Sequence, residues 1–190
     1  MIKSTVRAGR TLALALGVSA MVAGLAGGTA AADTVDEPMP GGPVQFLGPD
    51  GYGDLKLGMA PSTALQTGML VSYTNPGEGQ CKWAELNDQY TDGSYRENYV
   101  AISPMFGVSA ISVNRWNVRT PEGVGLGSTV DQVKAAYPDS AQQLQDGLDN
   151  LGHGYVNVPD STRPTVYRIH ATNNTVDQIA IQLAYQDCYE

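Results

Sequence analysis

The sequence predicts an α+β protein built of two tandem units, each a short helix packed on a small antiparallel β-sheet. Three observations support this prediction. A strand-glycine-helix phrase occurs twice, a hairpin pattern follows each copy at nearly the same distance, and Cys81 and Cys188 stand one in each of the two stretches. The units are expected at residues 51–120 and 121–190. The total length of 190 residues is that of a single domain, so the two units are expected to belong to one domain.

The repeated phrase covers Leu55–Ala64 in the first unit and Val124–Val133 in the second. Each copy begins with apolar residues in a strand pattern, passes a glycine and enters a helix. In the second copy, Thr129 stands three residues before Gln132, which is the spacing of a capping box. In the first copy, Pro61 suits the first position of a helix. Both copies therefore predict a short strand followed by a helix.

Hairpin patterns follow each phrase. The first pairs Tyr99–Ser103 with Val108–Val113, and the second pairs Tyr167–Ala171 with Val176–Ile181. The second turn contains Asn173–Asn174, and asparagine tolerates the positive φ angles of tight hairpin turns. Each unit therefore ends in two antiparallel strands.

Further strands are expected before each hairpin, at residues 81–86 and 155–158. One segment has no counterpart in the first unit. Residues 139–151 place Ala141, Leu144, Leu148 and Leu151 at helical spacing, but Gly147 lies among them. Whether this segment is helical is left open by the sequence.

The N-terminal residues 1–32 are typical of a secretory signal peptide. Lys3, Arg7 and Arg10 precede an apolar stretch, and a run of small residues ends at Ala32. Residues 33–50 are rich in proline and glycine and are interpreted as a flexible linker. We therefore expect a secreted, extracellular protein with no membrane contact after cleavage of the signal.

The charge balance argues against nucleic acid as a partner. The chain holds 11 basic and 19 acidic residues, a formal charge of −8, and the expected cleavage removes only basic ones. Phosphate binding needs clustered lysine or arginine, whereas those of the mature chain are scattered. A soluble body is expected, because no apolar run after the leader reaches the length of a membrane span.

Cys81 and Cys188 are the only cysteines, and an isolated pair in an exported protein usually forms a disulfide. This bond would tie the two units together. The chain-entropy model assigns so long a loop roughly 4 to 5 kcal/mol of stabilisation. A redox pair is disfavoured because the CxxC spacing is absent.

Catalytic motifs are weak throughout. Gly123–Thr129 lacks both the lysine and the glycine spacing of a phosphate loop. Asp88 and Asp92 begin a calcium-like pattern that fails at its third and twelfth positions. His153 and His170 have no neighbouring motif residues, and His153 is expected in a turn between two glycines. No cofactor and no metal site is therefore expected, and the acidic residues could support glycosidic hydrolysis only if the fold paired them.

Tyrosine is the more informative surplus, with 10 of the 14 aromatic residues. Tyrosine and tryptophan suit surfaces that bury apolar area in a complex yet remain wettable when free. The run from Tyr90 to Tyr95 resembles a recognition loop, with a plain β-turn as the alternative. The residues expected to contact a partner are Tyr90, Asp92, Tyr95, Trp116, Arg168 and His170.

The repeated phrase is similar to the one that opens each tandem unit of the β-lactamase inhibitory protein family. It also resembles small envelope lipoproteins of the SmpA/OmlA type, and the whole chain resembles uncharacterised secreted actinobacterial proteins. The first resemblance implies a helical element on an antiparallel sheet, twice over, with a concave protein-binding face. The chain departs from that family because it lacks a disulfide inside each unit, so inhibition of a particular enzyme is not inferred.

The sequence therefore favours a secreted, non-catalytic binding module that contacts an extracellular or cell-envelope protein. The alternative is a cell-envelope hydrolase with a site between the two units, and a passive wall component is a third reading. Oligomeric state and ligand identity are not specified by these patterns.

Overall fold

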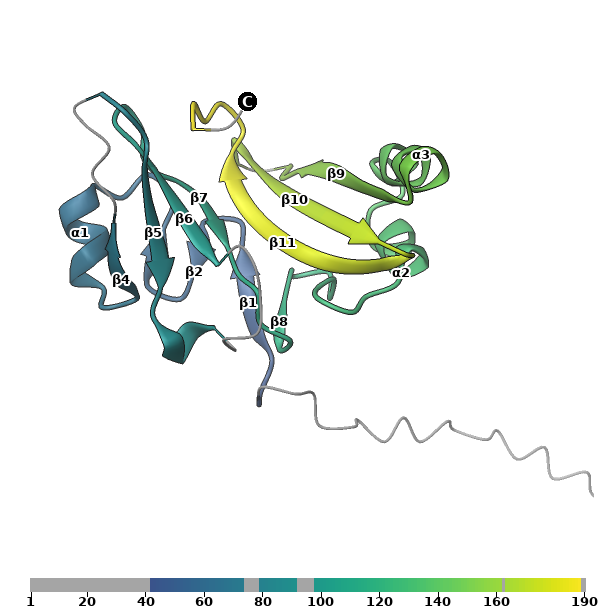
Figure 1. Cartoon of the computed structure of the whole chain (residues 1–190), viewed down its shortest axis with the longest axis horizontal. Helices are drawn as coiled ribbons and strands as arrows, with labels where there is room; N and C mark the ends of the chain where they lie inside the picture. Colours follow the sequence, from purple (N-terminus) through teal and green to yellow (C-terminus); the bar gives the residue numbers. More distant parts are fainter. Residues whose placement is uncertain (1–41, 74–78, 92–97, 162, 189–190) are drawn as a thin grey trace, which may run out of the picture. The chain divides into compact units, whose positions relative to one another are not determined.

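The computed structural model describes residues 42–73, 79–91, 98–161 and 163–188, all within a unit that spans residues 36–190 (Figure 1). The α+β class is confirmed. Residues up to Thr120 form β1 (Gln45–Gly48), β2 (Gly51–Tyr52), β3 (Leu55–Lys56), α1 (Pro61–Gln66), β4 (Leu70–Tyr73), β5 (Lys82–Leu86), a 3-10 turn (Asp88–Tyr90), β6 (Tyr99–Ser103), β7 (Gly107–Ser112) and β8 (Val118–Arg119). The remainder forms α2 (Val130–Ala136), α3 (Ala141–Leu151), β9 (His153–Pro159), β10 (Thr165–Thr172) and β11 (Thr175–Leu183).

Seven strands form one sheet in the order β4-β5-β6-β7-β11-β10-β9, and both expected hairpins lie in it. The hairpins meet where β7 pairs antiparallel with β11, for example at Ile111 and Ile181 (Figure 1). Both of these side chains are fully buried, so the pairing continues one apolar surface across the two predicted units. The small sheets expected of the units are thus joined edge to edge.

One face of this sheet, called here the inner face, forms the core. Cross-strand partners on it are buried from one end to the other, as expected for strands that alternate between core and solvent. The smaller sheet, in the order β3-β2-β1-β8, contributes Leu47 and Val118 to the same core. The hydroxyl of Tyr167 donates to the Leu47 carbonyl at 3.1 Å and so ties β10 to β1. The central row of the inner face is Ala84, Val100, Ile111, Ile181, Tyr167 and Val158.

The folded part begins earlier than the sequence predicts. Residues 45–48, expected in the linker, form β1, which pairs antiparallel with β2 and parallel with β8. Leu47 is fully buried there, and the side-chain amide of Asn117 donates to the Pro43 carbonyl at 2.6 Å. The burial of one leucine and pairing with a distant strand outweigh the proline and glycine content of the segment.

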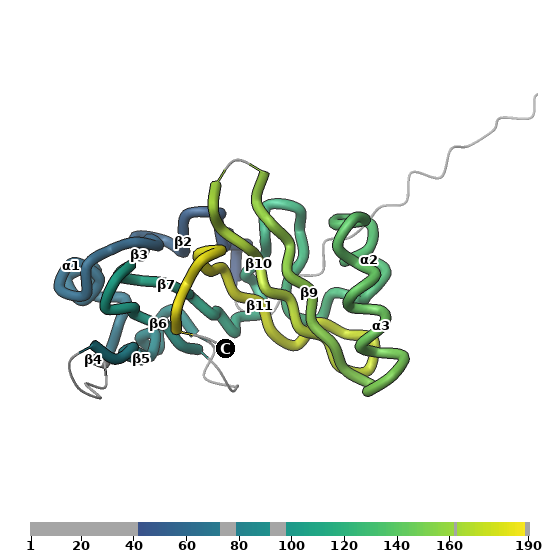
Figure 2. The backbone as a smooth tube through the Cα atoms, turned by 90° about the horizontal axis from the view of Figure 1, so that it is seen from above, coloured from purple at the N-terminus to yellow at the C-terminus, as the bar shows by residue number. Residues whose placement is uncertain are grey.

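Residues 141–151 are helical, which settles the segment that the sequence left open. Gly147 is required where α3 packs on β9, because a Cβ there would lie 2.8 Å from the Gly154 Cα. Figure 2 shows α3 running beside β9. Leu144 is buried under the helix, whereas Leu151 is 70% exposed. The glycine that argued against a helix is thus a contact point between two elements.

The two predicted phrases each form a helix with a different start. The Thr129 side chain accepts from the Gln132 amide and the Gln132 side chain accepts from the Thr129 amide, which is a full capping box for α2. Helix α1 begins at Pro61 after Ala60, which provides no side-chain cap. The residues just before each helix bind the second strand of the following hairpin through backbone hydrogen bonds.

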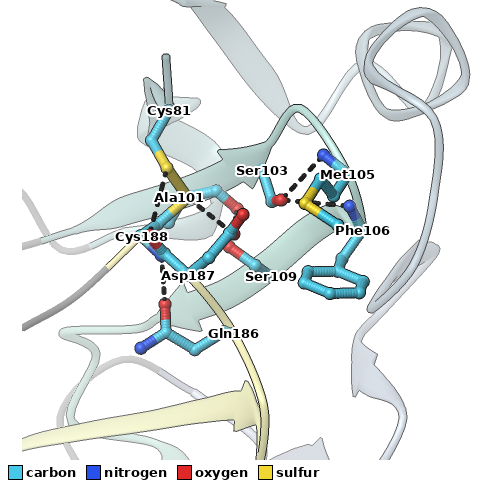
Figure 3. Close-up of a disulfide and its surroundings, with 9 residues drawn as sticks. All are labelled: Cys81, Ala101, Ser103, Met105, Phe106, Ser109, Gln186, Asp187 and Cys188. Carbon is cyan, nitrogen blue, oxygen red and sulfur yellow. Dashed lines mark hydrogen bonds between the residues drawn. A yellow bond between two sulfur atoms is a disulfide. The ribbon is translucent and has the colours of Figure 1, made fainter. Parts of the chain in front are cut away.

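The Cys81–Cys188 disulfide is confirmed, with 5.6 Å between the two Cα atoms (Figure 3). It connects the residue before β5 to the chain after β11. In the part of the chain that the structure describes, no helix is long and apolar enough to cross a membrane.

Candidate functional site

The face of β9 and β10 opposite the core is called here the outer face. Strand β9 alternates strictly, with His153, Tyr155 and Asn157 exposed and Val156 and Val158 turned to the core. On β10 the partners of the exposed residues are half-buried, and His170 stands directly across from Tyr155. The alternation therefore collects polar and aromatic side chains on one surface.

Arg168 and Tyr155 form the central contact of this surface. The guanidinium carbon of Arg168 lies 4.6 Å from the centre of the Tyr155 ring, within the range of a cation–π interaction. Arg168 stands across from Asn157 on one side and Ala180 on the other. Tyr155 remains 43% exposed and Arg168 is half-buried, so the pair lies at the surface with part of both side chains accessible.

His170 has a carboxylate partner on the neighbouring strand. Its Nδ1 lies 2.5 Å from an oxygen of Asp177, and its ring centre lies 5.8 Å from that of His153. The register of β10 and β11 shifts between His170 and Ala171, which leaves Asp177 as the extra residue of a β-bulge. A bulge turns a side chain that would otherwise face the opposite side of the sheet.

The structure brings together two of the six predicted contact residues, Arg168 and His170, on adjacent outward positions of β10. Trp116 is exposed, and its ring covers Gly127 before α2. Tyr90 ends the 3-10 turn and is partly buried against the core. Its ring meets Tyr52 edge-to-face at 6.4 Å, so it does not join the outer face. Asp92 and Tyr95 lie outside the described residues.

His153 is not in a turn, as the sequence predicted, but opens β9. Gly152 ends α3 in the left-handed conformation and returns the chain directly into the strand. Sequence reasoning missed His153, Tyr155 and Asp177 as neighbours of His170. The alternating pattern of 153–159 was a usable signal for the first two, whereas the bulge at Asp177 leaves no mark in the sequence.

Apart from the outer face, a depression with a volume of about 680 Å³ lies between the start of α1 and the turn of the β6–β7 hairpin. Its walls are mainly backbone and apolar side chains, including the 75% exposed Met105. Ser103 lines it, and its hydroxyl accepts from the Met105 and Phe106 amides, so this hydroxyl is already used by the turn (Figure 3). Among its described lining residues only Lys82 is charged, and this surface has little chemistry to offer.

Two buried tyrosines, Tyr137 and Tyr167, contribute to the stability of the fold and are not placed to take part in a reaction. Burial, together with the Glu122 carboxylate that its hydroxyl contacts at 2.6 Å, raises the pKa of Tyr137. Burial also raises the pKa of Tyr167, aided by the charge of Glu122. Both hydroxyls remain neutral and point into the protein, so neither is placed to donate or accept a proton at the surface.

The cysteine region holds no thiolate. Cys81, Cys188 and Asp187 place their sulfur and oxygen atoms close together, as a metal site would, but the two sulfurs are joined in the disulfide. The Gly123–Thr129 segment behaves as expected for a capped helix start, because it ends at Thr129, the N-cap of α2. The Ser128 hydroxyl accepts from the Gly125 amide within the segment.

No family model, curated protein or solved structure matches the chain.

Proposed function

We propose that the protein is a secreted, non-catalytic binding module whose outer face contacts an extracellular or cell-envelope protein. The observation that carries the proposal is the Tyr155–Arg168 pair, with Tyr155 exposed and Arg168 half-buried, on a β-surface bordered by Asn157 and His170. Tyrosine and arginine, with tryptophan, are enriched among the residues that contribute most binding energy near the centres of protein interfaces. The side-chain amide of Asn157, exposed beside them, can donate and accept hydrogen bonds in a complex.

Secretion is supported by two features. The N-terminal 32 residues have the charge, apolar stretch and small-residue run of a signal peptide. The Cys81–Cys188 disulfide fits an oxidising compartment. We therefore place the mature protein outside the cell, where an acidic chain remains dispersed and a protein partner is available.

The tandem arrangement is part of the same proposal. A sheet that continues through β7 and β11 gives two helix-bearing units one shared surface, as the resemblance to the β-lactamase inhibitory protein family implies. The matching backbone contacts of the two helix starts support an origin by duplication. The family likeness and the duplication are hypotheses of the proposal.

A hydrolase is the alternative, and the His153–His170–Asp177 cluster is the observation in its favour. The cluster lies within residues 121–190 rather than between the two predicted units. Among the described residues, neither histidine forms a hydrogen bond with the hydroxyl of a serine or threonine or with the thiol of a cysteine. The binding reading is therefore preferred, because an activated nucleophile needs such a partner.

Affinity capture tests the proposal. Mature, oxidised protein is immobilised, exposed to the culture medium and envelope fraction of the source cells, and the retained proteins are identified by mass spectrometry. The binding affinity of each retained protein is then measured for the parent and for Tyr155→Ala and Arg168→Ala. A loss of about 2 kcal/mol, roughly 30-fold, is expected at one or both positions.

Leu151→Ser is the matched control, since Leu151 is exposed on α3 and belongs to neither strand of the outer face. Its affinity for the captured protein should equal that of the parent. Retained proteins that bind all three variants equally well would refute the proposed surface. Turnover of a substrate that disappears in His170→Ala would replace the proposal with the hydrolase.

A further inference from the structure

His153 and His170 are the only histidines of the chain, and the fold brings both to one spot on the outer face. In the β9–β10 register, His153 is paired with Thr172 and His170 with Tyr155, so the two imidazoles are diagonal neighbours on the same face. Their ring centres are 5.8 Å apart and their planes are tilted by 39°. The only two imidazole side chains of the chain are therefore neighbours, which suggests that they bind a common ligand.

Asp177 fixes the state of one ring. Its carboxylate oxygen lies 2.5 Å from His170 Nδ1, and because a carboxylate can only accept, we assign the proton of this contact to Nδ1. In the neutral ring, the lone pair of His170 is then on Nε2, at the far end of the ring. Histidines that bind metals commonly have this arrangement, in which a carboxylate holds the second nitrogen and orients the ring.

The bulge that supplies Asp177 strengthens this reading. Asp177 and Gln178 are consecutive, yet neither is buried, because the extra residue breaks the alternation of β11 at this point. A regular strand would direct one of them into the core. Bulges often re-aim a side chain next to functional sites, and this one delivers a carboxylate to His170.

We propose that His153 and His170 bind one divalent transition-metal ion, with Asp177 as the positioning residue for His170. Imidazole nitrogen suits zinc, copper and nickel, whereas calcium and magnesium require oxygen ligands. Two imidazoles on one tetrahedral ion at about 2.0–2.1 Å place their ring centres about 5 Å apart. The observed separation of 5.8 Å is close to this value, so binding requires the two rings to move somewhat closer together.

The site has room for further ligands. His153 is exposed and His170 is only partly covered, so water or a side chain from another protein completes the coordination. This inference goes beyond the proposed binding function and does not depend on it, since it concerns the metal and the protein alone.

Zinc chloride is the probe for isothermal titration of the mature, oxidised, tag-free protein. One zinc per chain is expected for the parent. His153→Gln and His170→Gln should each abolish saturable binding, because no third histidine can substitute. Asp177→Asn should retain the stoichiometry and weaken affinity by about 10- to 100-fold.

Asp146→Asn is the matched carboxylate control, because Asp146 lies on α3 and bonds Gln142 instead of a histidine. Its zinc affinity should equal that of the parent, and calcium should give no saturable heat. Urea unfolding without zinc verifies that each glutamine variant is folded. Absence of saturable zinc binding in the parent, or unchanged affinity in either folded histidine variant, would overturn the proposal.

Discussion

The segments that precede α1 and α2 dock on their hairpins with the same two backbone hydrogen bonds. The Gly58 amide donates to the Val108 carbonyl and the Val108 amide donates to the Met59 carbonyl, both at 2.8 Å. In the later region, Gly127, Val176 and Ser128 form the corresponding pair of bonds, again both at 2.8 Å. The backbone geometry is therefore common to two regions whose side chains differ.

The difference lies in how closely each hairpin approaches the docked segment. Gly107, one residue before Val108, has a φ of +72°, and a Cβ there would lie 2.3 Å from the Met59 carbonyl oxygen. The corresponding position before Val176 is Thr175, which forms a bridge with Thr129 and remains exposed. The first region thus requires a glycine at position 107, whereas the second has room for the side chain of Thr175. The same hydrogen bonds are compatible with two local packing solutions.

The largest expected effect concerns the covalent link between the regions. Replacing both cysteines in Cys81→Ser/Cys188→Ser opens a loop of 107 residues and should lower the free energy of unfolding by about 4 kcal/mol. Urea unfolding of the parent and the double variant measures this loss. If each region were stable alone, the variant would instead show two separate transitions.

Gln80→Ser, at an exposed position beside Cys81, is the control for the double variant and should change stability by less than about 0.5 kcal/mol. A loss below about 1 kcal/mol in the double variant would contradict the chain-entropy account. The shared hydrophobic core would then hold the two regions together without the bond.

Alanine at Gly107 tests the difference in approach. The new Cβ clashes with the Met59 carbonyl and the backbone must keep a positive φ, so Gly107→Ala should cost roughly 2 to 4 kcal/mol in unfolding free energy. Thr175→Ala at the corresponding position should cost less than about 0.5 kcal/mol. Equal losses in urea titrations of the two variants would mean that the regions do not differ in this contact.

Local chemistry made several elements predictable. Thr129 and Gln132 indicate the start of α2. Asn173 and Asn174, which both have a positive φ, indicate the tight turn between β10 and β11. The cysteine pair was predictable because only two cysteines exist. In each case the deciding interaction lies within a few residues or involves a single available partner.

Contacts between distant segments were not predictable. Strand β1 is stabilised by β8, more than 70 residues later, while its own composition favours a linker. Strand β4 was missed because its residues 70–73 pair with β5 through an irregular register. On the outer face, Arg168 and His170 were both among the expected contact residues, but the Asp177 bulge beside them depends on the pairing of two strands.

Alkaline pH should weaken the later region through its buried tyrosines. The pKa of Tyr137 is raised above its ordinary value of 10.0, mainly by burial, so above pH 10 the unfolded chain loses a proton that the folded chain keeps. The unfolding free energy then falls with rising pH by about 1.4 kcal/mol per unit for each such tyrosine. Urea titrations between pH 9 and 11 measure the slope.

Tyr137→Phe should make the slope less steep by the contribution of one tyrosine. It should also lower the unfolding free energy at every pH, because the hydrogen bonds to Thr120 and Glu122 are lost. Thr129→Ala, which removes a helix cap and no ionisable group, is the control, and it should leave the slope unchanged. A slope in Tyr137→Phe identical to that of the parent would show that Tyr137 ionises equally in both states.

The smallest expected effect concerns the two helix starts. Thr129→Ala removes the side chain that accepts from the Gln132 amide and should cost about 1 kcal/mol in unfolding free energy. Ala60 has an extended backbone like Thr129 but offers no acceptor, so Ala60→Ser should raise stability by about 0.5 kcal/mol. Urea titrations of the two variants measure both changes. Opposite signs would show that the two helix starts differ in capping alone, whereas a loss in Ala60→Ser would mean that Pro61 and the docked backbone already determine where α1 begins.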